Sequence, residues 1–75
     1  MNTYHKLAQL AANQYYAARD GNPMALLIES IYCLLATEEE EGRLNPNDET
    51  ETRRLAEFVC DGAGITLDEL LSRFD

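Results

Sequence analysis

The stretch NPMALLIESIYCLLATEEEEG, residues 22–42, decides the fold of this chain. Asn22 is suited to cap a helix, and Pro23 to occupy its first turn, where the missing N–H costs no hydrogen bond. Gly42 is suited to end the helix. The apolar residues in between point in almost every direction around a helix, which is typical of a central one. We therefore expect a helix from Pro23 to about Glu41, with the other helices packed around it.

A second helix is predicted before this stretch, from Thr3 to Asp20. Asn2 or Thr3 can cap its first amides, and Gly21 can adopt the left-handed conformation that ends many helices. Apolar and small residues recur on one face at helical spacing. The inward residues are expected to be Tyr4, Leu7, Ala8, Ala11, Tyr15 and Ala18.

Two more helices are predicted after it. Asn45-Pro46 repeats the cap-and-proline pattern and predicts a helix to about Asp61, followed by a break at Gly62-Ala63-Gly64. Thr66 and Glu69 form a capping box at the start of a short last helix. The expected inward residues are Thr52, Leu55, Ala56, Phe58 and Val59, then Leu67, Leu70, Leu71 and Phe74. The prediction is an all-α fold: a single domain of residues 1–75, a small compact bundle of three main helices plus a short C-terminal helix.

The size and the cysteines limit the cellular context. Seventy-five residues lie near the lower size at which one apolar core gives more than about 3–5 kcal/mol, so a homodimer or a partner could complete the core. Cys33 and Cys60 lack metal-ligand spacing and are expected to be small buried thiols, not a disulfide. The longest apolar segment, Met24–Ala36, is too short to span a bilayer, and no signal-like stretch opens the chain. We expect a cytoplasmic protein with no membrane partner.

The negative charge is confined to the second half of the chain. Residues 1–37 are electrically balanced, whereas residues 38–75 hold twelve acids and four arginines and carry the entire net charge of −8. Such a field repels phosphate backbones and attracts basic protein surfaces. The expected partner is therefore a basic protein surface, such as that of a nucleic-acid-binding protein, and not nucleic acid itself.

The run Glu38–Glu41 is the strongest candidate site. Four carboxylates at the C-terminal end of a helix oppose its dipole and repel one another. Either a basic partner compensates them, or they only keep a small apolar protein soluble. More acids follow across the turn and on the outer face of the next helix. The predicted partner-binding residues are Glu38, Glu39, Glu40, Glu41, Asp48, Glu49, Glu51, Glu57 and Asp61.

The sequence predicts no enzyme, metal or cofactor. Asn45, Asn47 and Glu49 alternate as in an EF-hand loop, but the glycine that makes the loop's sharp turn is missing. One histidine, His5, and two distant cysteines make neither a zinc ligand set nor a nucleophile with its base. Gly62-Ala63-Gly64 precedes a helix, as phosphate-binding turns do, but the surrounding negative charge opposes that use.

Two hypotheses about function remain. The first is an acidic inhibitor whose carboxylates pair with Lys and Arg in the nucleic-acid groove of a target. In size and charge, though in no motif, the chain is similar to small acidic inhibitors of phages and mobile elements, including many anti-CRISPR proteins and DNA mimics. The second is a helical adaptor or regulatory module that acts as a homodimer or binds a larger partner protein. Its apolar contact residues would be Leu27, Ile31, Tyr32 and Leu35.

Overall fold

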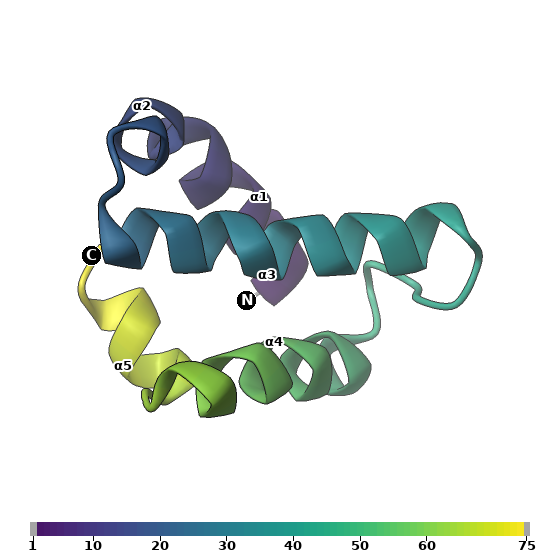
Figure 1. Cartoon of the computed structure of the whole chain (residues 1–75). Coiled ribbons are helices and arrows are strands. Elements are labelled where there is room, and N and C mark those ends of the chain that lie inside the picture. Colours follow the sequence, from purple (N-terminus) through teal and green to yellow (C-terminus); the bar gives the residue numbers. More distant parts are fainter. Residues whose placement is uncertain (1, 75) are drawn as a thin grey trace.

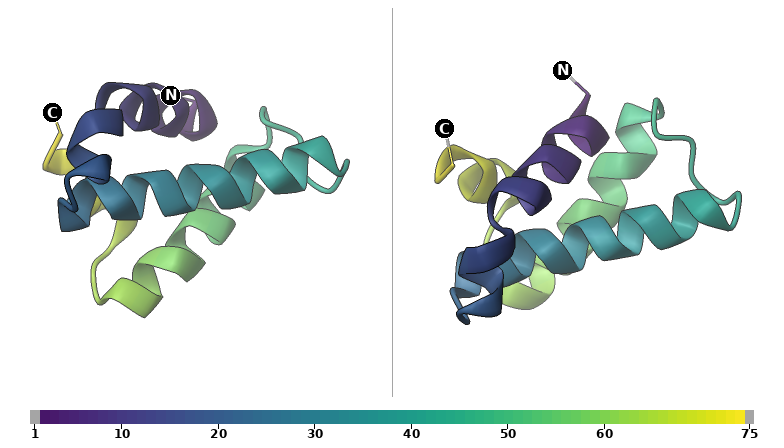
Figure 2. Two further views of the ribbon diagram at one scale, coloured as in Figure 1. Left: turned by 45° about the horizontal axis from the view of Figure 1, so that its top comes forward. Right: turned by 90° about the horizontal axis from the view of Figure 1, so that it is seen from above.

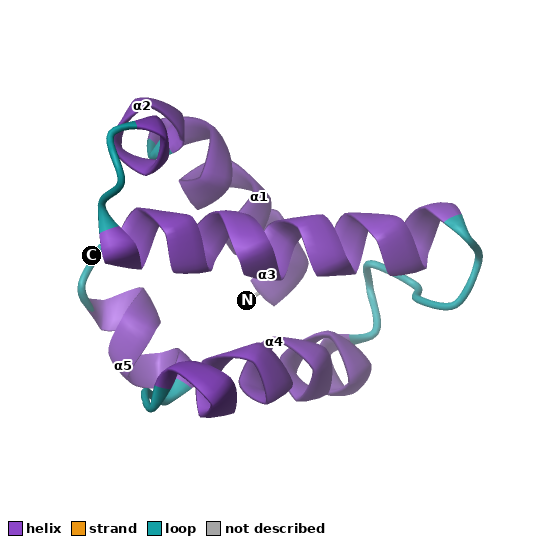
Figure 3. Cartoon of the chain, viewed as in Figure 1, coloured by secondary structure: helices purple, strands orange, loops and turns teal. Residues whose placement is uncertain are grey.

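The predicted all-α class is confirmed. We describe residues 2–74 of a computed structural model, in which five helices and no strand form (Figures 1 and 3). The helices are α1 (Thr3–Asn13), α2 (Tyr15–Arg19), α3 (Pro23–Glu40), α4 (Glu49–Ala63) and α5 (Leu67–Ser72).

Helix α3 is the central element, as its all-round apolar sequence predicts. It packs against α1 and α2 on one side and against α4 on another (Figure 2). The Asn22 side chain accepts hydrogen bonds from the amides of Met24 and Ala25 at 3.0 and 3.1 Å, so the predicted cap forms. Ile28, Ile31 and Leu35 are fully buried along its length. The stretch 22–42 therefore supplies the centre of the apolar core.

The predicted first helix is divided in two. Gln14 leaves helical geometry, with φ −99° and ψ 12°, and separates α1 from α2. Neither glycine nor proline lies there, so no local signal predicts the break. It lets α2 pack against the start of α3. After the break, Tyr15, which was expected inside, is half exposed, and in α1 the buried residues include Leu10, which was not expected inside.

The start of α4 also differs from the prediction. Asn45-Pro46 forms a turn in which the Asp48 amide donates to the Asn45 carbonyl at 2.9 Å, and the helix begins at Glu49. Asp48 is the actual cap, because its side chain accepts from the Glu51 amide at 3.0 Å. Asp48 therefore satisfies one of the first amides of α4, whereas the Asn45 side chain accepts from the Asn47 amide within the turn.

Two residues expected to be buried are exposed, for one reason. Thr52, Ala56 and Cys60 face the core at four-residue steps, and Phe58, two residues beyond Ala56, lies about 200° around the helix. Phe58 is therefore 73% exposed, and the prediction that it faces inward is wrong. Cys33 likewise lies two residues after a buried residue, Ile31, and is therefore exposed. Cys60 is buried as predicted.

Helix α4 ends two residues later than predicted, whereas α5 begins as the sequence predicts. Helix α4 continues through Gly62 to Ala63, and Gly64 ends it in the left-handed conformation with φ 75°. The Thr66 hydroxyl accepts from the Glu69 amide at 3.1 Å and caps α5. The residues that α5 buries against the core are Leu67, Leu70 and Leu71, with Phe74 partly covered.

No helix within residues 2–74 combines the length and the apolar character needed to cross a membrane.

Candidate protein-binding site

Seven of the nine predicted contact residues gather at one end of the molecule. The C-terminus of α3, the loop after it and the N-terminus of α4 all lie on that side of the molecule, at the right of Figure 1. We call this region the acidic end. It consists of Glu38, Glu39, Glu40, Glu41, Asp48, Glu49 and Glu51.

Arg43 partly offsets the charge at the C-terminus of α3. Its side chain forms ion pairs with both Glu38 and Glu41. Its amide donates to the Glu38 carbonyl at 2.8 Å and helps to close the helix. The hydrogen bond to Glu38 raises the pKa of the Arg43 guanidinium above its ordinary value. Within residues 2–74, the exposed side chains of Glu39 and Glu40 form no ion pair with an arginine.

Glu49 has a structural role that its sequence position does not show. Its carboxylate accepts a hydrogen bond from the Thr3 amide at 2.9 Å and another from the Thr3 hydroxyl. Thr3 is the first residue of α1, so α4 supplies a partner for an amide that α1 itself cannot satisfy. The side-chain bond, followed by the backbone bond, lowers the pKa of Glu49. Glu49 thus joins the N-termini of α1 and α4.

Glu51 is paired within its own helix. The Arg54 Nε donates to both oxygens of Glu51 at 3.0 and 3.1 Å, and this contact lowers the pKa of the Glu51 carboxyl. Arg43 and Arg54 are the two arginines that form ion pairs with carboxylates of the acidic end in the described part of the chain. If only the cations in ion pairs are counted, seven carboxylates against two guanidiniums leave an excess of five negative charges there, and Arg53 reduces this excess further through its Coulombic attraction for Glu49.

Glu57 and Asp61 lie away from the acidic end. They follow Glu49 by eight and twelve residues of α4, which is about 12 and 18 Å along the helix axis. Glu57 also lies 3.9 Å from the Arg53 guanidinium, which in turn contacts Asp68 of α5 at 2.7 Å. The structure therefore separates these two predicted contact residues from the other seven.

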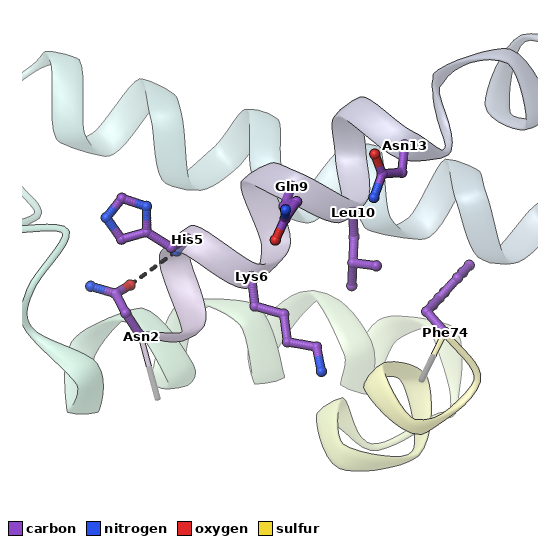
Figure 4. Close-up of a pocket in the computed structure, with 7 residues that line it drawn as sticks. All are labelled: Asn2, His5, Lys6, Gln9, Leu10, Asn13 and Phe74. Carbon is purple, nitrogen blue, oxygen red and sulfur yellow. Dashed lines mark hydrogen bonds between the residues drawn. The ribbon is translucent and has the colours of Figure 1, made fainter.

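A hollow of about 510 Å³ lies on a different surface, between α1 and the end of the chain near α5 (Figure 4). Its lining includes the single histidine, His5, and the single lysine, Lys6. No serine, cysteine or carboxylate lines it among the residues described, so His5 has neither a nucleophile nor an orienting acid beside it there. The full lining is Asn2, His5, Lys6, Gln9, Leu10, Asn13 and Phe74.

Over residues 2–74, the acids, histidine and cysteines form no group that could hold a metal ion. Asn45, Asn47 and Glu49, which alternate in the sequence, instead serve the turn and the tie to α1. The Asn45 side chain accepts from the Asn47 amide at 2.9 Å, and Asn47 accepts from the Asn2 side chain at 3.3 Å. Their oxygens are thus engaged in holding the chain together.

The apolar surface proposed for an adaptor is only partly accessible. Ile31 and Leu35 are completely buried in the core, so they cannot contact a partner, and that part of the prediction is wrong. Leu27 and Tyr32 are half-buried at the flanks of α3, and the Tyr32 ring lies edge-on to Tyr4 at 6.1 Å. The large apolar side chains that the structure does expose are Tyr15, Tyr16, Leu26 and Phe58.

The chain matches no protein-family model, no curated protein and no solved structure. A function can therefore be argued only from its own charge and geometry.

Proposed function

We propose that this protein is a non-enzymatic inhibitor that binds, through its acidic end, a basic surface of a nucleic-acid-binding protein. The observation that carries the proposal is the excess of five negative charges contributed by two helix ends and the loop between them. At about 0.15 M salt the screening length is about 8 Å, so carboxylates that lie within that distance of one another act on a partner together. A groove that holds phosphates has the complementary charge.

The exposed carboxylates of Glu39 and Glu40 carry the expected contact. They lie at the C-terminus of α3, where a negative charge opposes the helix dipole, and they form no ion pair with an arginine among residues 2–74. Lys and Arg side chains of a target would offset this unfavourable arrangement through charge-assisted hydrogen bonds. Small acidic inhibitors of phages and mobile elements, including anti-CRISPR proteins and DNA mimics, offer an analogy of size and charge for this mode of action.

The proposal is tested by capture from a lysate of the source cells at low and high salt. The immobilised wild-type chain is compared with a variant in which Glu38–Glu41 are replaced by Gln. We expect the wild type to retain a nucleic-acid-binding protein at low salt and to release it at about 1 M salt, where the screening length falls to about 3 Å. Duplex DNA or RNA added as competitor should displace the captured protein from the immobilised chain, because nucleic acid and the acidic end are expected to bind the same groove of that protein.

A second variant controls for total charge. Replacing Asp20, Glu29, Asp68 and Glu69 by the corresponding amides removes four negative charges elsewhere. This variant should capture the same protein as the wild type. Equal capture by the Gln variant of residues 38–41, or a complex that nucleic acid does not displace, would show that the acidic end is not the binding surface.

A further inference from the structure

The outer face of α4 has an exposed aromatic ring between two opposite charges. Phe58 is 73% exposed, and Arg54 and Asp61 are exposed on the same face, four residues before it and three after it. Steps of three and four residues keep side chains on one side of a helix. This face lies opposite the buried face formed by Thr52, Ala56 and Cys60, and α4 forms one edge of the molecule (Figure 1).

We propose that this face binds the same face of a second copy, with the two α4 helices antiparallel about a two-fold axis near Phe58. Arg54 and Asp61 lie about 6 and 4.5 Å from Phe58 along the helix axis, in opposite directions. The two-fold rotation therefore places Arg54 beside the partner's Asp61, and Asp61 beside the partner's Arg54. The two Phe58 rings then pack on each other at the centre.

The charge pattern favours a second copy over an unrelated partner. A two-fold interface requires a surface that is complementary to itself, and a cation and an anion at similar distances on either side of an aromatic ring meet that requirement. A parallel pairing would instead bring Arg54 against the partner's Arg54. The pair formed by Arg54 and Glu51 does not prevent the contact, because Glu51 accepts from Nε and Nη2 of Arg54 and the Nη1 donors remain for a second carboxylate.

The acidic ends, which hold much of each copy's net charge of −8, do not exclude the dimer. In the antiparallel arrangement the two acidic ends point in opposite directions along the helix pair. Glu51 lies seven residues from Phe58, so it is about 20 Å from the partner's Glu51 along the axis. That separation exceeds two screening lengths of about 8 Å at physiological salt, and the repulsion between the two acidic ends is small.

A single helix pair makes a small interface, so the expected dimer is weak and forms at about 0.1–1 mM protein. Sedimentation equilibrium of the full chain should show an average mass that rises above 8.5 kDa with concentration. Phe58→Ser should keep the mass of a monomer. Because Phe58 is exposed, this variant should melt at the wild-type temperature, which circular dichroism checks. Leu26→Ser, which removes another exposed apolar side chain, should associate as the wild type does.

A charge exchange tests the geometry independently of Phe58. Arg54→Glu and Asp61→Arg should each weaken the dimer by about tenfold, because each places like charges side by side. The double variant restores opposite charges and should recover the wild-type dissociation constant within about threefold. A wild-type chain that stays monomeric at 1 mM, undiminished association of Phe58→Ser, loss of association in Leu26→Ser, or no recovery in the double variant would each overturn the proposal.

Discussion

Replacement of Glu49 by Gln tests whether the tie between α1 and α4 holds the fold together. The Glu49 carboxylate accepts two hydrogen bonds from Thr3, one from its amide at 2.9 Å and one from its hydroxyl. The amide of Gln keeps the shape of the side chain but offers one oxygen in place of two, and no charge. The Thr3 amide is one of the unsatisfied groups at the start of α1, so it has no alternative partner within its own helix.

The magnitude follows from the number and kind of the bonds. A hydrogen bond to a charged group contributes about 1.5–3 kcal/mol and a neutral one about 0.5–1.5 kcal/mol, so the lost charge is worth about 1–1.5 kcal/mol per bond and about 2–3 kcal/mol for two bonds. Glu49 is only half-buried, and solvent screening reduces this value. We therefore expect Glu49→Gln to lower the free energy of unfolding by about 1 kcal/mol, and Tm by about 4–8 °C.

The effect should depend on pH with a defined sign. The folded pKa of Glu49 lies below its ordinary value of 4.5 because the ionised form accepts the two bonds. Its contribution is present above the unfolded pKa and is lost as the pH falls through the folded one. Thermal unfolding followed by circular dichroism should show the full difference between wild type and variant at pH 7. The difference should shrink as the pH falls below 4.5.

Glu40→Gln is the matched control. Glu40 is exposed and lies at the C-terminus of α3, where the helix dipole disfavours its charge, so its replacement should leave Tm unchanged or slightly raised. Two results would refute the reasoning: equal Tm values for wild type and Glu49→Gln at pH 7, or a difference that is as large in acid as at neutral pH.

Three further predictions concern the thiols, the glycines at the end of α4 and an unpaired hydroxyl. In the folded protein a thiol reagent should modify exposed Cys33 rapidly and Cys60 slowly, because burial raises the pKa of the Cys60 thiol and covers its sulfur. Equal modification rates of the two cysteines, followed by mass spectrometry, would contradict this. Gly64→Ala should lower the free energy of unfolding by about 1 kcal/mol, because the φ of Gly64 is 75°, whereas Gly62→Ala, within α4, should raise it by about 0.5–1 kcal/mol. Urea titrations that rank the stabilities of the two variants the other way would refute Gly64 as the residue that ends α4. Thr52→Val should raise the free energy of unfolding by about 1 kcal/mol, because the buried Thr52 hydroxyl has no hydrogen-bond partner in the structure. A loss of stability in the same urea titration would show that this hydroxyl does form a hydrogen bond.

The candidate site could be located from the sequence only in part. The density of acids after residue 37 indicates an anionic region, and the turn between two predicted helices brings their ends together. Which carboxylates remain available depends on contacts between distant residues. Arg53 of α4 meets Asp68 of α5, fifteen residues later, and Glu49 meets Thr3, forty-six residues earlier. No spacing rule predicts such pairs.

The sequence alone determined where the helices lie and how most of them begin and end. Helical hydrogen bonds join residues four apart, and caps act within the same distance, so Asn22, Thr66 and Gly64 act through their immediate neighbours. The excess negative charge of the second half follows from its composition alone and needs no structure.

Tertiary packing decided the rest. No glycine or proline marks the break at Gln14, which forms where α2 packs against α3. Phe58 is exposed because the opposite face of α4 packs against the core. The packing of α1 against α4 also places the Glu49 carboxylate where it accepts a hydrogen bond from Thr3. These features depend on how helices fit against one another, and that fit is set by the shapes of side chains far apart in the chain.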